Sequence, residues 1–149
     1  MDKWDDRFLS MAAEISTYSK DPSTKTGAVI VRPDKTVAAM GYNGFPAKLC
    51  DDEDLYADRE VKYERIIHCE MNAVLNARER VEGYTLYTWP FLSCPRCAVH
   101  MITAGITKVV APACPDDKLN RWGFALERTK DLFREAGVEI VEYKEEDLV

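Results

Sequence analysis

The chain of 149 residues lacks several features that would place it in a specialised class of protein. It has no apolar run near the roughly 18 residues that a membrane-spanning helix needs. No repeat, low-complexity tract or Gly/Ser-rich linker interrupts it, so residues 1–149 are expected to form one domain with its own core. Its first residues, MDKWDDRF, are acidic and polar, which predicts no signal peptide and a cytoplasmic location.

Positive charge is also in short supply. The net charge is −6, and residues 50–60, CDDEDLYADRE, concentrate acidic side chains. Proteins that hold a polyanion usually present a basic face. The balance therefore argues against nucleic acid and favours a small-molecule partner.

The chain has few metal-binding or disulfide-forming residues. There are only two histidines and an odd number of cysteines, namely Cys50, Cys69, Cys94, Cys97 and Cys114. An odd count in a chain with no predicted leader argues against a disulfide framework. Metal binding or simple burial is the better interpretation of these cysteines.

Apolar periodicity predicts four helices and five strands. The helices are expected over 3–18, 64–80, 94–105 and 121–137, and the strands within 28–43 (two strands around a Pro-Asp-Lys turn) and over 84–89, 107–112 and 138–143. Residues 44–63 look irregular. A hairpin followed by strand–helix–strand units predicts a single α/β/α sandwich, with one mixed five-stranded sheet and helices on both faces.

Two short motifs, each at the start of an expected helix, carry the chemistry. One is His68-Cys69-Glu70, and the other is Cys94-Pro95-Arg96-Cys97. Either motif alone is a weak signal, since a lone C-x-x-C is often a redox pair. Together they offer one imidazole and two thiolates, which are ligands that zinc prefers. Backbone N–H groups at a helix start also stabilise thiolates.

No good fourth ligand accompanies these three. Cys69 adjoins His68, and neighbouring side chains rarely reach one ion well. His100 lies about one turn beyond Cys97 and is expected to face solvent or a partner. Cys50 and Cys114 are better explained by packing. Three protein ligands and an open position are typical of catalytic zinc, and Glu70 is the base that a zinc-bound water would need.

Longer stretches resemble the deoxycytidylate (dCMP) deaminase family of zinc-dependent nucleobase deaminases. The matching stretches are SKDPSTKTGAVIV, GYNGFP, HCEMNAVLN, SCPRCAVHMITAGITKVV and REAGVEI, which follow the family's order and cover most of residues 8–140. The signature H-x-E followed by P-C-x-x-C belongs to such deaminases. The long segment between Asn43 and His68 also suits this family.

The resemblance implies a role for each matched residue. His68, Cys94 and Cys97 would hold one Zn²⁺ per chain, and Glu70 would carry protons while water replaces the amine at C4 of cytosine. Asn43 would contact the sugar, although it could equally be a turn residue. The backbone near Cys69 and Leu92 would meet the pyrimidine edge. The resemblance further implies a homo-oligomer, a hexamer in this family, and raises dCTP and dTTP as effectors.

The chain departs from the family at three places. Cys69 stands where alanine is usual, and Ser93 where a proline is expected. In the segment 111–128, Arg121 and Trp122 fall close to positions where the family carries a tyrosine and acidic residues, which leaves the phosphate state of the substrate open. Trp122 could be a core residue or part of a substrate lid. Too few histidines remain for the second zinc that some members bind.

The leading hypothesis is conversion of dCMP to dUMP. Lys20, Lys25 and Arg121 lie in loops expected to border the pocket and could meet a phosphate. The alternatives are another cytosine nucleotide or nucleoside (dCTP, CMP or 5-substituted dCMP), a deaminase that edits nucleic acid, and a non-catalytic zinc or nucleotide-sensing module. Glu70 argues against the last, because a structural zinc site needs no proton carrier.

Overall fold

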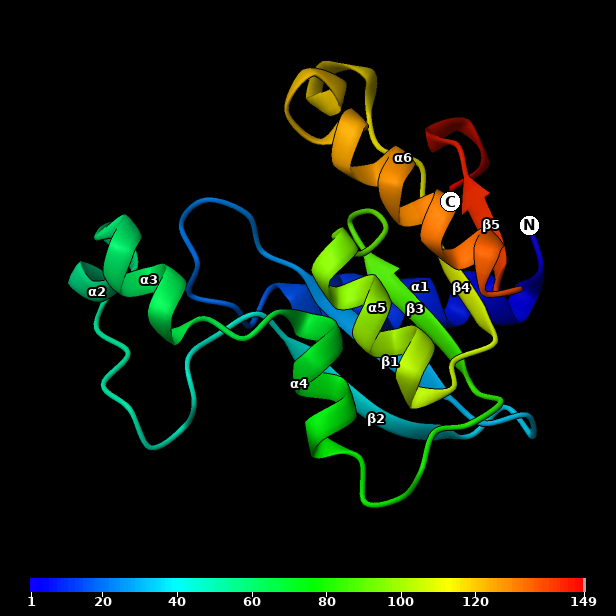
Figure 1. Ribbon diagram of the computed structural model, residues 1–149, viewed down its shortest axis with the longest axis horizontal. Helices are drawn as coiled ribbons and strands as arrows, with labels where there is room; N and C mark the ends of the chain where they lie inside the picture. The colour runs from blue at the N-terminus through cyan, green and yellow to red at the C-terminus, as the bar shows by residue number, and fades with distance from the viewer. Residues whose placement is uncertain (149) are drawn as a thin grey trace.

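Five strands form one mixed sheet in the order β2-β1-β3-β4-β5 (Figure 1). Their bounds are β1 Gly27–Val31, β2 Val37–Tyr42, β3 Thr85–Trp89, β4 Lys108–Pro112 and β5 Glu139–Tyr143. β1 pairs antiparallel with both β2 and β3, whereas β3, β4 and β5 run parallel. The structure is a computed structural model that describes residues 1–148, so Val149 of the expected domain lies outside the described part.

Helices cover both faces of the sheet. α1 (Lys3–Ser16) lies on one face, and α4 (Cys69–Asn76), α5 (Pro95–Ala104) and α6 (Leu119–Glu135) lie on the other (Figure 1). The alternation of side chains along β1 sets this up: Val29 and Val31 pack toward α1, and Ala28 and Ile30 join the opposite core. The predicted fold class is therefore confirmed.

Two predictions for residues 44–80 are wrong. Residues 44–63 contain α2 (Glu53–Ala57) and most of α3 (Arg59–Arg65), whose N-terminus is capped by the Asp58 carboxylate accepting from the Val61 N–H. The helix expected over 64–80 is shorter, because Gly44 and Ile67 exchange two backbone hydrogen bonds and hold 66–68 extended. The helix that follows, α4, therefore starts at Cys69, and it ends at Asn76 rather than at residue 80. Two short 3₁₀ turns complete the chain, Asp116–Lys118 and Glu145–Asp147.

α4 crosses closely over β2, the outermost strand on its side of the sheet. A Cβ at Gly41 would lie 2.7 Å from the Cys69 carbonyl oxygen, so only glycine permits this approach. The side-chain amides of Asn72 and Asn76 donate to the carbonyls of Tyr42 (2.7 Å) and Met40 (3.1 Å). The start of α4, with His68 at its N-cap, is thus fixed against the sheet.

A buried carboxylate ties α1 to two strands. Asp5 is 4% exposed and accepts hydrogen bonds from the hydroxyls of Tyr87 on β3 (2.7 Å) and Tyr143 on β5 (2.6 Å).

Among the described residues, no helix is both long and apolar enough to cross a bilayer.

Candidate active site

Three metal-binding side chains meet where α4 and α5 begin. His68 is the N-cap of α4, Cys94 is the N-cap of α5, and Cys97 lies in the first turn of α5. Nδ1 of His68 is 3.2 Å from Sγ of Cys97 and 3.5 Å from Sγ of Cys94. The three ligand atoms lie within 4.8 Å of one another, and residues 1–148 contain no other such cluster of three or more His, Cys, Asp or Glu side chains.

This donor set fits zinc. One imidazole nitrogen and two sulfurs suit a tetrahedral Zn²⁺, and three protein ligands leave its fourth position open. His68 and Cys94 line a cavity, whereas Cys97 is buried. A Zn²⁺ held by these three residues would therefore be reached from the cavity.

Contacts among these three side chains shift their pKa values. Hydrogen bonds to the Cys94 sulfur, first from Cys97 and then from His68, lower the pKa of Cys94 to about 4. The same contact with Cys94 raises the pKa of Cys97, and that of His68 rises as well. One thiolate forms readily, and binding a metal displaces the remaining protons.

Glu70 lies in the first turn of α4, two residues after His68, and lines the same cavity. It is 5% exposed, and its Oε1 accepts a hydrogen bond from the Cys69 thiol at 2.7 Å. Burial raises the pKa of Cys69 well above its ordinary value, so this thiol remains a neutral donor. A carboxylate at the cavity floor beside an open metal position can carry protons without being a ligand.

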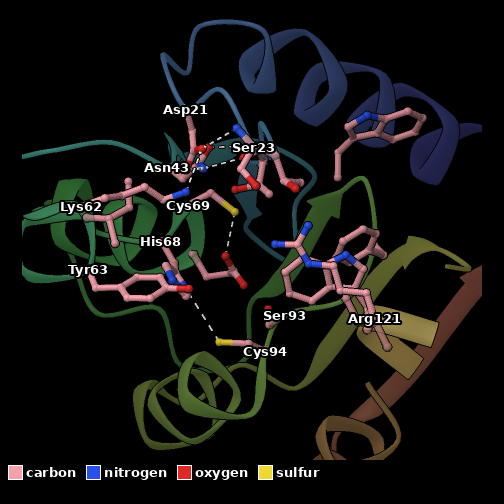
Figure 2. A pocket seen from close by; sticks show the side chains of 18 residues that line it. Asp21, Ser23, Asn43, Lys62, Tyr63, His68, Cys69, Ser93, Cys94 and Arg121 are labelled. Carbon is pink, nitrogen blue, oxygen red and sulfur yellow. Dashed lines mark hydrogen bonds and ion pairs between the residues drawn. The ribbon is translucent and has the colours of Figure 1, made fainter. Parts of the chain in front are cut away.

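The cavity has walls of different chemistry (Figure 2). Its volume is ≈ 160 Å³. The polar wall, from the loop before β1 and the end of β2, consists of Asp21, Ser23, Thr24, Thr26 and Asn43, and α3 and its C-cap form a second wall of Lys62, Tyr63 and Ile66. The floor, at the starts of α4 and α5, consists of His68, Cys69, Glu70, Leu92, Ser93 and Cys94. The aromatic wall, at and after the end of β3 and at the start of α6, consists of Trp89, Phe91, Arg121 and Trp122.

Asn43 holds the polar wall together. Its Nδ2 donates to the Thr24 carbonyl (2.8 Å) and to Asp21 Oδ2 (3.3 Å), and its Oδ1 accepts from the Thr26 N–H (2.9 Å). Both amide donors are therefore engaged by the loop. What Asn43 can still offer a ligand is the second lone pair of Oδ1, as an acceptor.

Residues 2–113 match the family described as "Cytidine and deoxycytidylate deaminase zinc-binding region". The chain belongs to this family. The predicted family and its His–Cys–Cys zinc site are thus confirmed, and the chain is a member of a family of zinc-dependent deaminases.

The chain matches different fractions of the length of its relatives. An uncharacterized deaminase in the luxG 3′ region of Aliivibrio fischeri is 41% identical over 138 residues, which cover 93% of this chain and 92% of that protein. Human deoxycytidylate deaminase is 34% identical over 115 residues, which cover 72% of this chain. The chain spans 64% of the human protein and 54% of the probable deoxycytidylate deaminase of Caenorhabditis elegans.

Solved structures of the family share the fold. The dCMP deaminase of cyanophage S-TIM5 in apo form superposes with a TM-score of 0.72 at 22% identity, over 95% of this chain and 99% of that one. The same phage enzyme in complex with dCMP and dUMP gives a TM-score of 0.70 at 23% identity, over 91% and 93% of the two chains.

Most of the residues expected to contact substrate do line the deaminase cavity. Cys69 and Leu92 lie at its floor, both buried. The Arg121 guanidinium carbon lies 4.8 Å from the centroid of the Trp122 ring, which in turn lies 5.6 Å from that of Phe91. Half-buried Trp122 is therefore a wall of the cavity rather than a fully buried core residue.

Two expected phosphate contacts lie elsewhere. Lys20 pairs with Asp51 at 2.9 Å on the surface, and the Lys25 ammonium donates to the Ser19 carbonyl. Neither lysine is among the residues that line the cavity.

Sequence reasoning missed the contribution of α3. Lys62 and Tyr63 face the cavity from a segment expected to be irregular. The available signal was the Asp58 cap followed by seven residues, five of which (Arg, Glu or Lys) have good helix propensity. Asp21, within the SKDP stretch, was also missed as the partner of Asn43 and Lys62.

Proposed function

We propose that the protein catalyses hydrolytic deamination of the cytosine of a monomeric nucleotide, with dCMP as the favoured substrate, giving dUMP and ammonia. The observation that carries this proposal is the placement of Glu70. Its buried side chain lines the same cavity as His68 and Cys94, two members of the His68–Cys94–Cys97 cluster.

The roles of the residues follow from this placement. His68, Cys94 and Cys97 would hold Zn²⁺, which when bound lowers the pKa of a water molecule at its fourth position. Glu70 would take one proton from the attacking water at its carboxylate and give it to N3 of the ring. It would then take the second proton from the new hydroxyl at C4 and give it to the departing amine. Water is consumed, the C4–N bond breaks, and ammonia leaves with uracil as the product base.

Three features support a nucleotide as the substrate. The polar wall around Asn43 offers a place for a sugar, and two cations, Lys62 and Arg121, line the cavity. Several relatives are deoxycytidylate deaminases, and the structurally similar phage enzyme was solved with dCMP and dUMP. The net charge of −6 disfavours a polyanion.

An ammonia-release screen tests the proposal. Zinc-loaded protein is assayed against dCMP, deoxycytidine, CMP, dCTP, 5-methyl-dCMP and a short single-stranded oligonucleotide at one salt concentration. We expect kcat/KM to be highest for dCMP and turnover to vanish in Glu70→Ala. Higher kcat/KM for deoxycytidine would contradict the phosphate preference, and no release from any cytosine compound would overturn the proposal.

One feature favours a second candidate, deamination of a base in single-stranded nucleic acid. Trp122, Phe91 and the stacked Arg121 resemble the aromatic and cationic surfaces on which bases stack. In the same screen this alternative requires the oligonucleotide to exceed dCMP. A homo-oligomer, control by dCTP or dTTP and a cytoplasmic location stay predictions.

A further inference from the structure

Lys62 is a partly buried cation with unused hydrogen-bond donors. Its side chain is 17% exposed and lines the cavity, and its ammonium forms an ion pair with Asp21 Oδ1 at 3.0 Å. An ammonium has three N–H donors. Within residues 1–148, Asp21 is the only hydrogen-bond partner of Lys62 Nζ. Since the side chain is 17% exposed and lines the cavity, the remaining donors can be taken by an acceptor that arrives with a ligand.

Asp21 fixes the position of that ammonium. Its side chain is 5% exposed, and it also accepts from the Ser23 N–H at 2.8 Å and from Asn43 Nδ2 at 3.3 Å. The carboxylate is thus held from three directions, which restrains Lys62 before any ligand binds. Such preorganisation reduces the entropy lost on binding.

The shared carboxylate places Lys62 beside Asn43. One oxygen of Asp21 receives Lys62 and the other receives Asn43, so both donors converge on one end of the cavity (Figure 2). Arg121 reaches the cavity from the other side, among the aromatic residues. In a nucleotide bound with its amine toward the metal cluster, the sugar carries the phosphate away from the base. The cation at the sugar end is then the one that the phosphate meets.

We propose that Lys62 is the specificity-determining residue that binds the phosphate monoester of the substrate, with Asp21 as its positioning residue. This rests on the proposed function, because it takes Asn43 as the sugar end of a nucleotide site. Lys62 acts as a point charge with free donors, which is how lysine commonly binds phosphate.

A purely structural role for Lys62 predicts something different. α2 and α3 pack mainly on each other and lie to one side of the sheet (Figure 1), and the ion pair with Asp21 ties α3 to the rest of the domain. If holding α3 in place were the whole role, loss of Lys62 would lower kcat/KM equally for substrates with and without a phosphate. If Lys62 binds the phosphate, its loss lowers kcat/KM only for the phosphorylated substrate.

The test compares dCMP with deoxycytidine in Lys62→Met, Lys62→Arg and the control Lys48→Met, which removes an exposed lysine from the same segment. One lost charged contact should lower kcat/KM for dCMP about 10- to 100-fold in Lys62→Met, with deoxycytidine nearly unchanged. Lys62→Arg should keep most of the preference, and Lys48→Met all of it. Equal losses for both substrates in Lys62→Met would overturn the inference.

Calorimetric binding of dUMP and deoxyuridine to the same proteins separates this inference from the proposed function. If wild type prefers dUMP and Lys62→Met does not, the inference stands even if no cytosine compound is deaminated. If both proteins prefer dUMP equally, Lys62 is not the phosphate ligand, although the deaminase proposal survives. Equal binding of the two ligands by wild type would refute the inference.

Discussion

Loss of the buried Asp5 carboxylate should clearly destabilise this fold. The carboxylate accepts hydrogen bonds from Tyr87 at 2.7 Å and Tyr143 at 2.6 Å, and so joins α1 to two strands that are far apart in the sequence. In Asp5→Ala both hydroxyls lose their acceptor. Tyr87 is 1% exposed and cannot reach water, whereas half-buried Tyr143 can partly rehydrate.

The magnitude follows from that difference. A hydrogen bond to a charged group contributes about 1.5–3 kcal/mol, so Tyr87 should account for roughly 2 kcal/mol and Tyr143 for about 1 kcal/mol. We therefore expect Asp5→Ala to lower the free energy of unfolding by about 3 kcal/mol, or about 6–12 °C in Tm. Asp5→Asn keeps one acceptor and should lose roughly half as much.

Urea unfolding followed by tryptophan fluorescence measures this directly. Asp6→Ala is the matched control, because Asp6 also lies in the first turn of α1 and its removal costs only the helix-dipole contribution of about 0.3–1 kcal/mol. If Asp5→Ala were no less stable than Asp6→Ala, the carboxylate would not be the link between α1 and the sheet.

Three further predictions concern protons and metal. Glu70→Ala should keep zinc and its circular dichroism but lose about 10²–10⁴-fold or more in kcat, and near wild-type turnover would remove Glu70 from the mechanism. Elemental analysis should find one zinc per chain in wild type and little in His68→Ala, whereas two per chain would contradict the single cluster. Burial and the Asp5 contact raise the pKa of Tyr143 from 10.0 to about 12, so the folded state holds this proton more tightly than the unfolded state. The contribution of the protonated Tyr143 to the free energy of unfolding should be complete below pH 10 and should be lost toward pH 12. The free energy of unfolding should therefore fall less over this pH range in Tyr143→Phe than in wild type. An equal fall in the two proteins would exclude Tyr143 as the cause.

Local patterns in the sequence are sufficient for the sheet and for the metal cluster. Residues 27–31 are continuously apolar, which is what a central strand buried on both faces requires. Gly105, in the left-handed conformation, ends α5 at the last residue of the helix expected over 94–105. The ligands of the cluster are close in sequence to helix starts, so their convergence needs only the two helices to pack on one face.

Contacts between distant loops could not be foreseen in the same way. Lys20 and Lys25 belong to the loop before β1, which does line the cavity. The direction of a lysine side chain depends on the nearest acceptor, which is Asp51 for Lys20 and the Ser19 carbonyl for Lys25. Lys62 faces the cavity because Asp21, 41 residues earlier, holds it there. No periodicity along α3 encodes a partner at that separation.

The asparagines of α4 have a consequence for how copies of the chain can associate. The backbone of Asn43 bonds toward Thr26, so by alternation the carbonyls of Met40 and Tyr42 point away from β1, and Asn76 and Asn72 occupy them. A strand from another molecule that added to the sheet at β2 would have to compete with Asn72 and Asn76 for these carbonyls. Met40 and Tyr42 are nevertheless 52% and 42% exposed, which would make an open edge here prone to aggregation. The two amides therefore compete with backbone pairing at β2, while its apolar side chains stay exposed for packing.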